Sequence, residues 1–235
     1  MVSFKQYKNI VQPPTVSWMG YRYISPYISW VLVHTPITAN QVSAFWASLV
    51  IVSSVLIFFN NYLLGGFLFG LAAILDYVDG EIARYNKTKS LKWGEFFDWI
   101  STWLSYLLPL SALTFSIFLT TESKLFLFFG VFSIFGYSMV ELVRLEDVKI
   151  HPEKAFRKDV AKIPFKKKLV RSYKNLFLIP YFHNVFFLFA IIDSFVLSGF
   201  MKYFLLYYFI GFNLLWGLKV LYELFFGFKD EKNSK

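Results

Sequence analysis

The chain reads Asp76-Tyr-Val-Asp79-Gly80-Glu-Ile-Ala83-Arg84 and, after a loop of nine residues, Gly94-Glu-Phe-Phe-Asp98-Trp-Ile-Ser-Thr102. Both segments continue directly into long apolar runs. A carboxylate beside such a run is costly unless it has a partner charge, so three aspartates in this position need an explanation. The default explanation is a functional site, and the rest of the chain can be interpreted as its scaffold.

Helical spacing brings the polar and the small residues of these segments together. The first segment places two carboxylates and two very small residues at i, i+3, i+4 and i+7, on one helical face: Asp76, Asp79, Gly80 and Ala83. On the next helix, Asp98 and Thr102 are an i, i+4 pair. Two acidic faces joined by a short loop predict an all-oxygen site, which suits Mg²⁺, Mn²⁺ or Ca²⁺.

The same residues carry a resemblance to a known family. The pattern DxxDGxxAR, a loop and GxxxD resembles the signature of the CDP-alcohol phosphatidyltransferases, which are integral membrane enzymes. Their motif is D-x-x-D-G-x-x-A-R-x8-G-x-x-x-D-x-x-x-D, and all its fixed residues except the last stand here in order. The fourth aspartate is replaced by Thr102, and the loop is one residue longer, which a surface loop tolerates.

The resemblance implies a reaction and a set of roles. A hydroxyl of an acceptor attacks the β-phosphorus of a CDP-linked lipid, giving a phosphodiester and releasing CMP. Two divalent ions, Mg²⁺ or Mn²⁺, would neutralise the pyrophosphate, with Asp76, Asp79 and Asp98 as the metal ligands. The resemblance also implies which residues contact the CDP group: Asp76, Asp79, Gly80, Ala83, Arg84, Gly94 and Asn40.

The general base is an open question, because a threonine cannot accept a proton at neutral pH. Glu95 and Asp98 are i, i+3 and fall near the face of Thr102, so either could serve. A substrate phosphate or a metal-bound hydroxyl are the alternatives. Loss of a positioned base typically slows a reaction about 10²- to 10⁴-fold, so a slow enzyme without one is conceivable.

Composition predicts an all-α protein integral to a membrane. Of 235 residues, 57% are hydrophobic and 22% aromatic, and only 17% are charged. The absence of cysteine excludes disulfides and thiolate chemistry. The net charge is +9, but we expect membrane lipid and not nucleic acid as the partner, because the charges are unevenly distributed along the apolar runs.

Six apolar segments are long enough to span a membrane, which takes about 20 residues. They cover residues 40–59, 62–84, 94–119, 125–145, 176–197 and 202–226. Residues 1–39 are predicted to be a cytoplasmic and interfacial segment, with an interfacial helix over Trp18–Leu32 interrupted by Pro26. Residues 40–228 form the transmembrane domain and 229–235 a polar tail. Thr35 to Ser43 offers helix caps and resembles the segment that opens the family's first membrane helix.

The distribution of Lys and Arg predicts the orientation. Tight turns near residues 60, 122 and 199 receive only Lys124 and Lys202, Lys219 lies within the sixth span, and the remaining 21 lie on the other side. By the positive-inside rule that side is cytoplasmic, with both termini and the acidic motif facing it. If the chain is prokaryotic, the membrane is the cell membrane.

Other polar residues have simpler explanations. Lys149–Lys174 carries ten Lys and Arg, which is typical of a segment resting on anionic headgroups, although one or two could bind an acceptor phosphate. Arg144 could bind that phosphate too, or form an ion pair with Glu141. The three histidines, His34, His151 and His183, are expected at the membrane interface. Asp193 and Glu223 lie in spans without a motif.

Three interpretations follow. The first is an active phosphotransferase that uses a CDP-linked lipid donor, CDP-diacylglycerol or an archaeal analogue, and a small alcohol or phosphorylated polyol as acceptor. The second is a relative impaired at position 102, which binds CDP-lipid and metal without turnover. The third, a membrane prenyltransferase or cation transporter, ranks low because the chain lacks a second aspartate-rich motif and a polar path across the bilayer. A homodimer is expected from the resemblance alone.

Overall fold

The computed structural model describes residues 3–11, 21–86, 92–150 and 179–222. Within these ranges the side chains of residues 22, 92–99, 102, 144–150, 179–181 and 222 are not described. The described residues form helices and no strand: α1 (Phe4–Val11), α2 (Tyr21–Leu32), α3 (Ala39–Phe58), α4 (Tyr62–Tyr85), α5 (Lys92–Thr121), α6 (Lys124–Ile150), α9 (Ile179–Phe195) and α10 (Met201–Tyr222). The predicted all-α class is therefore confirmed for this part of the chain.

Six of these helices coincide with the six predicted spans, and the tight turns separate them where expected. Within the described residues five helices are long and apolar enough to cross a membrane, namely α3, α4, α10 and the larger parts of α5 and α6. The apolar part of α9 is shorter, at Phe182–Phe195. The helices thus indicate an integral membrane protein. That residues 176–197, which contain α9, also span the membrane, and that both termini are cytoplasmic, stay predictions.

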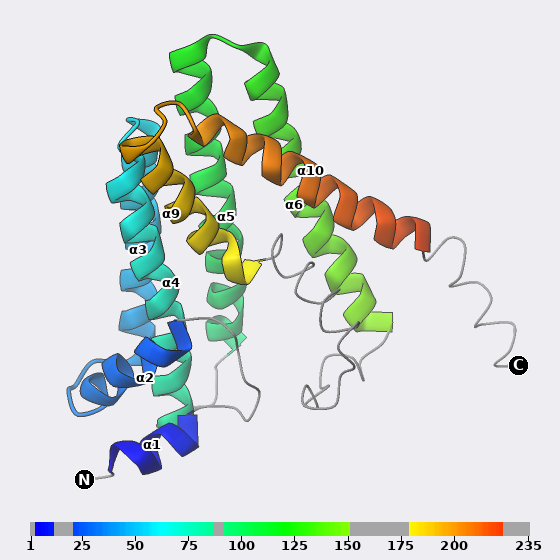
Figure 1. Cartoon of the computed structure of the whole chain (residues 1–235). Helices are drawn as coiled ribbons and strands as arrows, with labels where there is room; N and C mark the ends of the chain where they lie inside the picture. Colours follow the sequence, from blue (N-terminus) through cyan, green and yellow to red (C-terminus); the bar gives the residue numbers. More distant parts are fainter. Residues whose placement is uncertain (1–2, 12–20, 87–91, 151–178, 223–235) are drawn as a thin grey trace, which may run out of the picture.

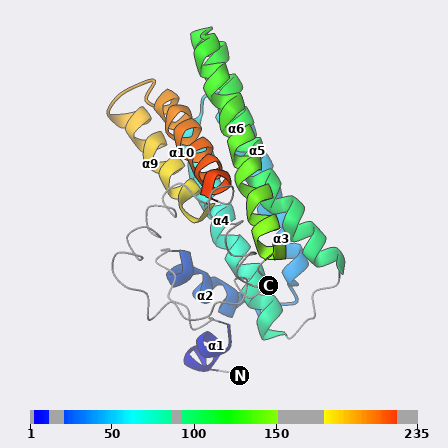
Figure 2. The same cartoon turned by 90° about the vertical axis from the view of Figure 1, so that its right-hand side faces the viewer.

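The long helices form a bundle in which α4 is central. It packs against α3, α9 and the two N-terminal helices, while α5 packs against α3 and α6, and α10 packs along α6. In Figure 1, α3, α4, α5 and α6 stand side by side, and α10 runs obliquely past α6. Figure 2 shows α1 and α2 at the lower end of the bundle, beside the end of α4.

The α3–α4 pair is held closely together at its upper end. Ser53 Oγ donates to the backbone oxygen of Gly65 across the pair at 2.8 Å. A Cβ atom at position 65 would lie 2.7 Å from Cγ1 of Ile57, so only glycine permits this approach. Asn60, with φ of 63°, makes the turn between the helices in a conformation that asparagine tolerates better than most residues.

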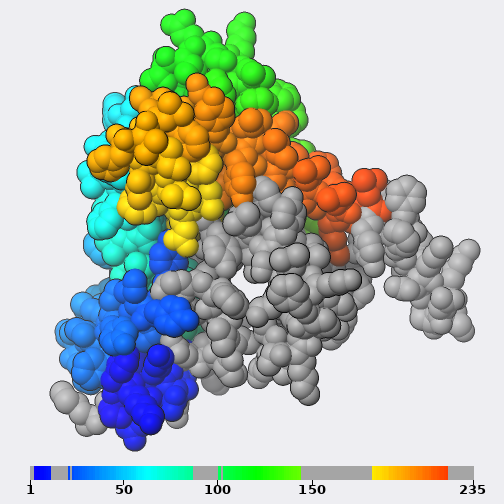
Figure 3. Space-filling view, in the orientation of Figure 1, coloured from blue at the N-terminus to red at the C-terminus, as the bar shows by residue number. Residues whose placement is uncertain are grey.

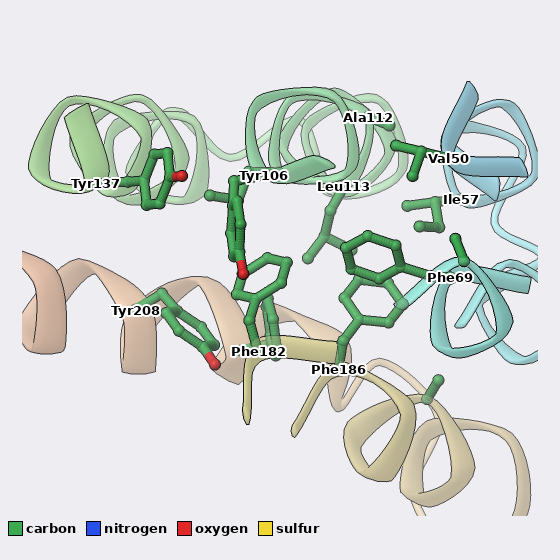
Figure 4. Close-up of a cluster of buried hydrophobic side chains, with 14 of the residues drawn as sticks. Val50, Ile57, Phe69, Tyr106, Ala112, Leu113, Tyr137, Phe182, Phe186 and Tyr208 are labelled. Atoms are coloured by element: carbon green, nitrogen blue, oxygen red, sulfur yellow. The ribbon is translucent and has the colours of Figure 1, made fainter. Parts of the chain in front are cut away.

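Aromatic side chains fill the interior on the other side of α4. Figure 4 shows rings from α4, α5, α6, α9 and α10 gathered in one layer. The rings of Tyr106 and Tyr137 stack at 4.6 Å between centroids, and Phe182 contacts Tyr208 at 4.9 Å. Such contacts add to the burial of large apolar surfaces, so this layer joins the C-terminal helices to the first half of the bundle.

The N-terminal segment is more ordered than predicted. α2 lies within the residues expected to form the interfacial helix. It continues through Pro26 instead of being interrupted there. Residues 4–11, for which no helix was predicted, form α1. Figure 3 shows these N-terminal helices, in blue, below α3 and α9 on this face. Their location at the membrane interface stays a prediction.

Two isolated polar residues of the predicted spans have clear positions. The ring of His183 packs 4.1 Å from the Phe69 ring and also contacts Tyr106, so it lies within the bundle, and its location at the membrane interface stays a prediction. Asp193 accepts a hydrogen bond from the backbone N–H of Met201 at 2.9 Å, so it caps the start of α10. His34 is exposed at the end of α2. The basic segment after residue 150, with His151, and Glu223 lie outside the described residues.

Candidate functional site

The first acidic segment forms the last turns of α4, and its small and acidic residues share a face as predicted. Asp76, Asp79, Gly80 and Ala83 are all partly buried, and Arg84 is exposed. The helix ends at Tyr85, one residue after Arg84, where a cation interacts favourably with the C-terminal end of the helix dipole. The structure therefore brings the two carboxylates of α4 together with the residues that leave space beside them.

Asp79 is held by two side chains of α3. Its Oδ2 atom accepts hydrogen bonds from Ser43 Oγ at 2.6 Å and from Trp46 Nε1 at 2.9 Å. Asn40, predicted near the CDP group, is exposed in the first turn of α3, three residues before Ser43 on the same helical face. The start of α3 thus faces the acidic end of α4.

Asp76 lines a small cavity between five helices. The cavity has a volume of about 60 Å³. Its lining residues come from α2, α3, α4, α5 and α9: Tyr21, Trp46, Val50, Ala72, Ala73, Asp76, Tyr77, Ser105, Tyr106 and His183. This space accommodates a few water molecules and no nucleotide. The hydroxyl of Tyr21 donates to Oδ1 of Asn184, which ties α2 to α9 beside the cavity.

Among the described residues, no neighbouring helix fills the space beside Gly80. A Cβ atom built at this position would meet only the guanidinium of Arg84, with its nearest nitrogen at 3.3 Å. The guanidinium is the flexible end of a side chain from the same helix. Within the part of the chain that the structure describes, the missing side chain at Gly80 therefore serves no helix packing, in contrast to Gly65, and leaves room for a bound group beside the backbone.

Glu81 occupies a variable position of the motif and is the most buried of the motif's charged residues whose side chains are described, with 3% of its surface exposed. Its carboxylate accepts hydrogen bonds from Ser25 Oγ at 2.8 Å and from Ser29 Oγ at 2.5 Å, both on α2. A buried carboxylate needs such donors, so this contact attaches the interfacial helix to the motif helix. Sequence reasoning missed it, although Ser25 and Ser29 are i, i+4 on the predicted interfacial helix.

Arg84 connects the motif to α1. Its Nε–H donates to the backbone oxygen of Val11, the last residue of α1, at 2.9 Å. Tyr7 of the same helix is fully buried and its ring packs 5.1 Å from that of Tyr85. Burial, with a smaller contribution from the nearby Glu81 carboxylate, raises the pKa of Tyr7 to about 12, so its hydroxyl stays neutral at physiological pH. Both N-terminal helices thus dock on the motif.

The second half of the motif begins α5. Gly94, Glu95, Asp98 and Thr102 lie in this helix, but their side chains are outside the described set, as is that of Arg144 in α6. Ser105 and Tyr106, which follow Thr102 by three and four residues, line the cavity beside Asp76. Among the side chains described, no three carboxylate or imidazole groups come together as a metal site. The predicted ligand set of Asp76, Asp79 and Asp98 therefore stays a prediction.

Comparison with known proteins agrees with this geometry. No curated protein matches the chain. The model of one family, described as CDP-alcohol phosphatidyltransferase, matches residues 36–196. The match runs from the residues before α3 to the end of α9 and includes every residue of the acidic motif. Members of this family transfer substituted phosphate groups from CDP-alcohols. The chain belongs to the CDP-alcohol phosphatidyltransferase family.

Proposed function

We propose that the chain is an active enzyme of phospholipid biosynthesis. It transfers a phosphatidyl-type group from a CDP-linked lipid, CDP-diacylglycerol or an archaeal analogue, to a hydroxyl of a small alcohol or phosphorylated polyol, and it releases CMP. The observation that carries the proposal is the acidic end of α4, where Asp79 is fixed by α3 beside a glycine against which no other described helix packs. The homodimer inferred from the family belongs to the same proposal.

The donor set of this site suits a divalent metal, Mg²⁺ or Mn²⁺. Asp76 and Asp79 supply carboxylate oxygens from α4, and Asp98 would supply the third carboxylate from α5. Oxygen ligands without sulfur or imidazole are typical of hard cations. A bound metal neutralises pyrophosphate charge and lowers the pKa of a bound hydroxyl. Asp79 has its carboxylate already oriented by two donors, which supports its role as a ligand.

The nucleotide end of the donor fits the surface beside Gly80. The cavity at Asp76 is too small for a nucleotide, so the CDP group would lie along the open face of α4. Gly80, Ala83 and Gly94 give it room, and Arg84 and Asn40, both exposed, lie at the edges of this face. Arg84 already donates to α1 through Nε, which fixes the position of its guanidinium.

In the transfer step the acceptor oxygen forms a bond to the β-phosphorus, and the bond from that phosphorus to the bridging oxygen breaks. CMP departs with the electron pair, and the hydroxyl proton passes to a base. Asp98 and Glu95 are the proposed bases, next to Thr102 on the first turns of α5. Arg144 is the proposed ligand of an acceptor phosphate. The acidic motif faces the cytoplasm in this proposal, because most Lys and Arg lie on that side.

A second candidate function rests on Thr102, which stands where the family motif has an aspartate. Without a carboxylate there, the protein would bind CDP-lipid and metal without turnover. Both candidates predict nucleotide binding, and only the first predicts CMP.

The experiment is CMP release by purified protein in nanodiscs with CDP-diacylglycerol and Mg²⁺ or Mn²⁺, offering each acceptor separately. The parent is compared with Asp98→Asn and Thr102→Asp. We expect metal-dependent CMP release with one acceptor, abolished in Asp98→Asn. No CMP release by the parent, with CMP release by Thr102→Asp, would favour the impaired relative. No CMP release by either protein, together with no nucleotide binding, would overturn the proposed function.

A further inference from the structure

We propose that Ser43 and Trp46 are positioning residues that hold the Asp79 carboxylate in the orientation in which it binds the divalent metal. The inference rests on the proposed function, because it takes Asp79 as a ligand. Neither residue belongs to the acidic motif, and both lie on α3, more than 30 residues before Asp79 in the chain. Their effect on the reaction would pass entirely through this carboxylate.

Both donors reach the same oxygen of Asp79. Ser43 Oγ lies 2.6 Å and Trp46 Nε1 2.9 Å from Oδ2. These distances are typical of hydrogen bonds to an ionised acceptor, which are about twice as strong as bonds between neutral groups. Rotation of the carboxylate about its last torsion would break both bonds at once, so together they define one orientation.

The two donors have few alternatives. Trp46 is 3% exposed, and its indole N–H can only donate a hydrogen bond. Without the Asp79 carboxylate this buried N–H would lose its acceptor, which is costly. Ser43 Oγ also lies 3.1 Å from the backbone oxygen of Ala39, but its single proton is shared with the nearer carboxylate. The contact is therefore strongly favoured from both sides of the helix pair.

The donors themselves are on a rigid element. α3 starts with a capping box, in which Thr38 Oγ1 accepts from the backbone N–H of Gln41 and the Gln41 side chain accepts from the N–H of Thr38. Further along the pair, Ser53 bonds to Gly65. The cap defines the start of α3 one turn before Ser43, and the Ser53 contact helps to hold the two helices together.

Groups that orient a metal ligand typically change metal affinity or activity by about 10- to 100-fold when removed. We therefore expect Ser43→Ala and Trp46→Phe each to raise the Mn²⁺ concentration for half-maximal binding by about 10-fold or more. Binding is measured by electron paramagnetic resonance of free Mn²⁺, with the full chain in nanodiscs of phosphatidylcholine. In CMP release, the same variants should need more metal at unchanged KM for the donor.

Matched controls separate positioning from general stability. Ser48→Ala removes a hydroxyl of the same helix that bonds only its own backbone, at Phe45, and Trp216→Phe removes an indole bonded to Asn213. Neither should change metal binding. Ser43→Thr keeps the hydroxyl and should restore the affinity lost in Ser43→Ala. All variants are compared by thermal unfolding, so that a folding defect is recognised.

A spectroscopic signature completes the test. The chain has seven Trp residues, and 5-fluorotryptophan labelling gives each a ¹⁹F resonance, with that of Trp46 identified by its loss in Trp46→Phe. We expect the Trp46 resonance to shift when Mg²⁺ is added, and the Trp216 resonance to stay. Mn²⁺ binding equal to that of the parent in both Ser43→Ala and Trp46→Phe would overturn the positioning role alone. A parent that binds no Mn²⁺ would overturn the proposed function, and the positioning role with it.

Discussion

The two ends of α4 use small residues for different purposes. Near the start of the helix, Gly65 and Gly66 are buried, and Cβ atoms there would lie 2.7 Å from Ile57 and 3.2 Å from Phe186. Near its end, a Cβ atom at Gly80 would meet no other helix among the described side chains. The first pair allows helices to approach closely, as small residues do throughout membrane proteins, whereas the second keeps a surface open beside two carboxylates. A glycine in a membrane helix therefore needs its neighbours before it can be assigned a role.

The largest expected effect is at the acidic end. Asp79→Asn keeps a carbonyl oxygen for Ser43 and Trp46 but removes the charge, so we expect CMP release to fall about 10³-fold, equivalent to about 4 kcal/mol, with normal folding. Asp193→Asn is the matched control, because an amide oxygen can still cap α10 there. A parent-like rate in Asp79→Asn would show that the acidic end is not the catalytic one.

A second test removes the contact that attaches α2 to this end. Glu81→Ala loses two hydrogen bonds to a buried carboxylate, each worth about 1.5–3 kcal/mol, so we expect the free energy of unfolding to fall by about 3 kcal/mol or more. Thermal or denaturant unfolding in detergent measures it. The double variant of Ser25→Ala and Ser29→Ala should lose a similar amount, and adding Glu81→Ala to it should cost little more. If the losses in unfolding free energy of Glu81→Ala and of the double serine variant simply added in the triple variant, the contact between these residues would be contradicted.

The same substitution at the two kinds of glycine should have opposite consequences. Gly65→Ala forces a Cβ against Ile57 and should destabilise the protein by about 1–3 kcal/mol in unfolding measurements. Gly80→Ala displaces only the Arg84 guanidinium, so its stability should stay the same or rise by about 0.5–1 kcal/mol. If the donor lies along this face, CMP release by Gly80→Ala should fall about 10- to 100-fold. Equal behaviour of both variants would remove the distinction between the two ends.

The smallest expected effect concerns the close contact at the upper end. Ser53→Ala removes one hydrogen bond to the Gly65 carbonyl, and we expect a loss of about 1 kcal/mol in unfolding free energy with unchanged CMP release. A large loss of activity in this variant would show that a change in the spacing of α3 and α4 at the upper end also changes the geometry of the acidic end.

Sequence patterns predicted most of the helices because their signals are local. Apolar runs of about 20 residues and short polar turns placed the helix boundaries of α3 to α6 within a few residues of those observed. The helical period likewise placed Asp76, Asp79 and Gly80 on one face. The helix α1 was missed because eight residues with two lysines carry no apolar run. The continuation of α2 through Pro26 was missed because a proline usually interrupts a helix.

The partners of the motif could not be predicted in the same way. The contact of Asp79 with Ser43 and Trp46 depends on the rotation and axial position of α3 against α4, which a single sequence does not encode locally. Glu81 stands at a variable motif position, so the pattern gave it no role, and its burial depends on where α2 docks. The polar contacts between helices were thus the part of the site that required a structure.

The described partners of the charged residues of α4 have one more property, which concerns synthesis. Ser43 and Trp46 for Asp79, Ser25 and Ser29 for Glu81, and the Val11 carbonyl for Arg84 all precede α4 in the chain. Since a chain emerges from the ribosome N-terminus first, these groups are already made when α4 enters the membrane. The carboxylates of Asp79 and Glu81 can therefore meet these donors during insertion, before any of the later helices exist.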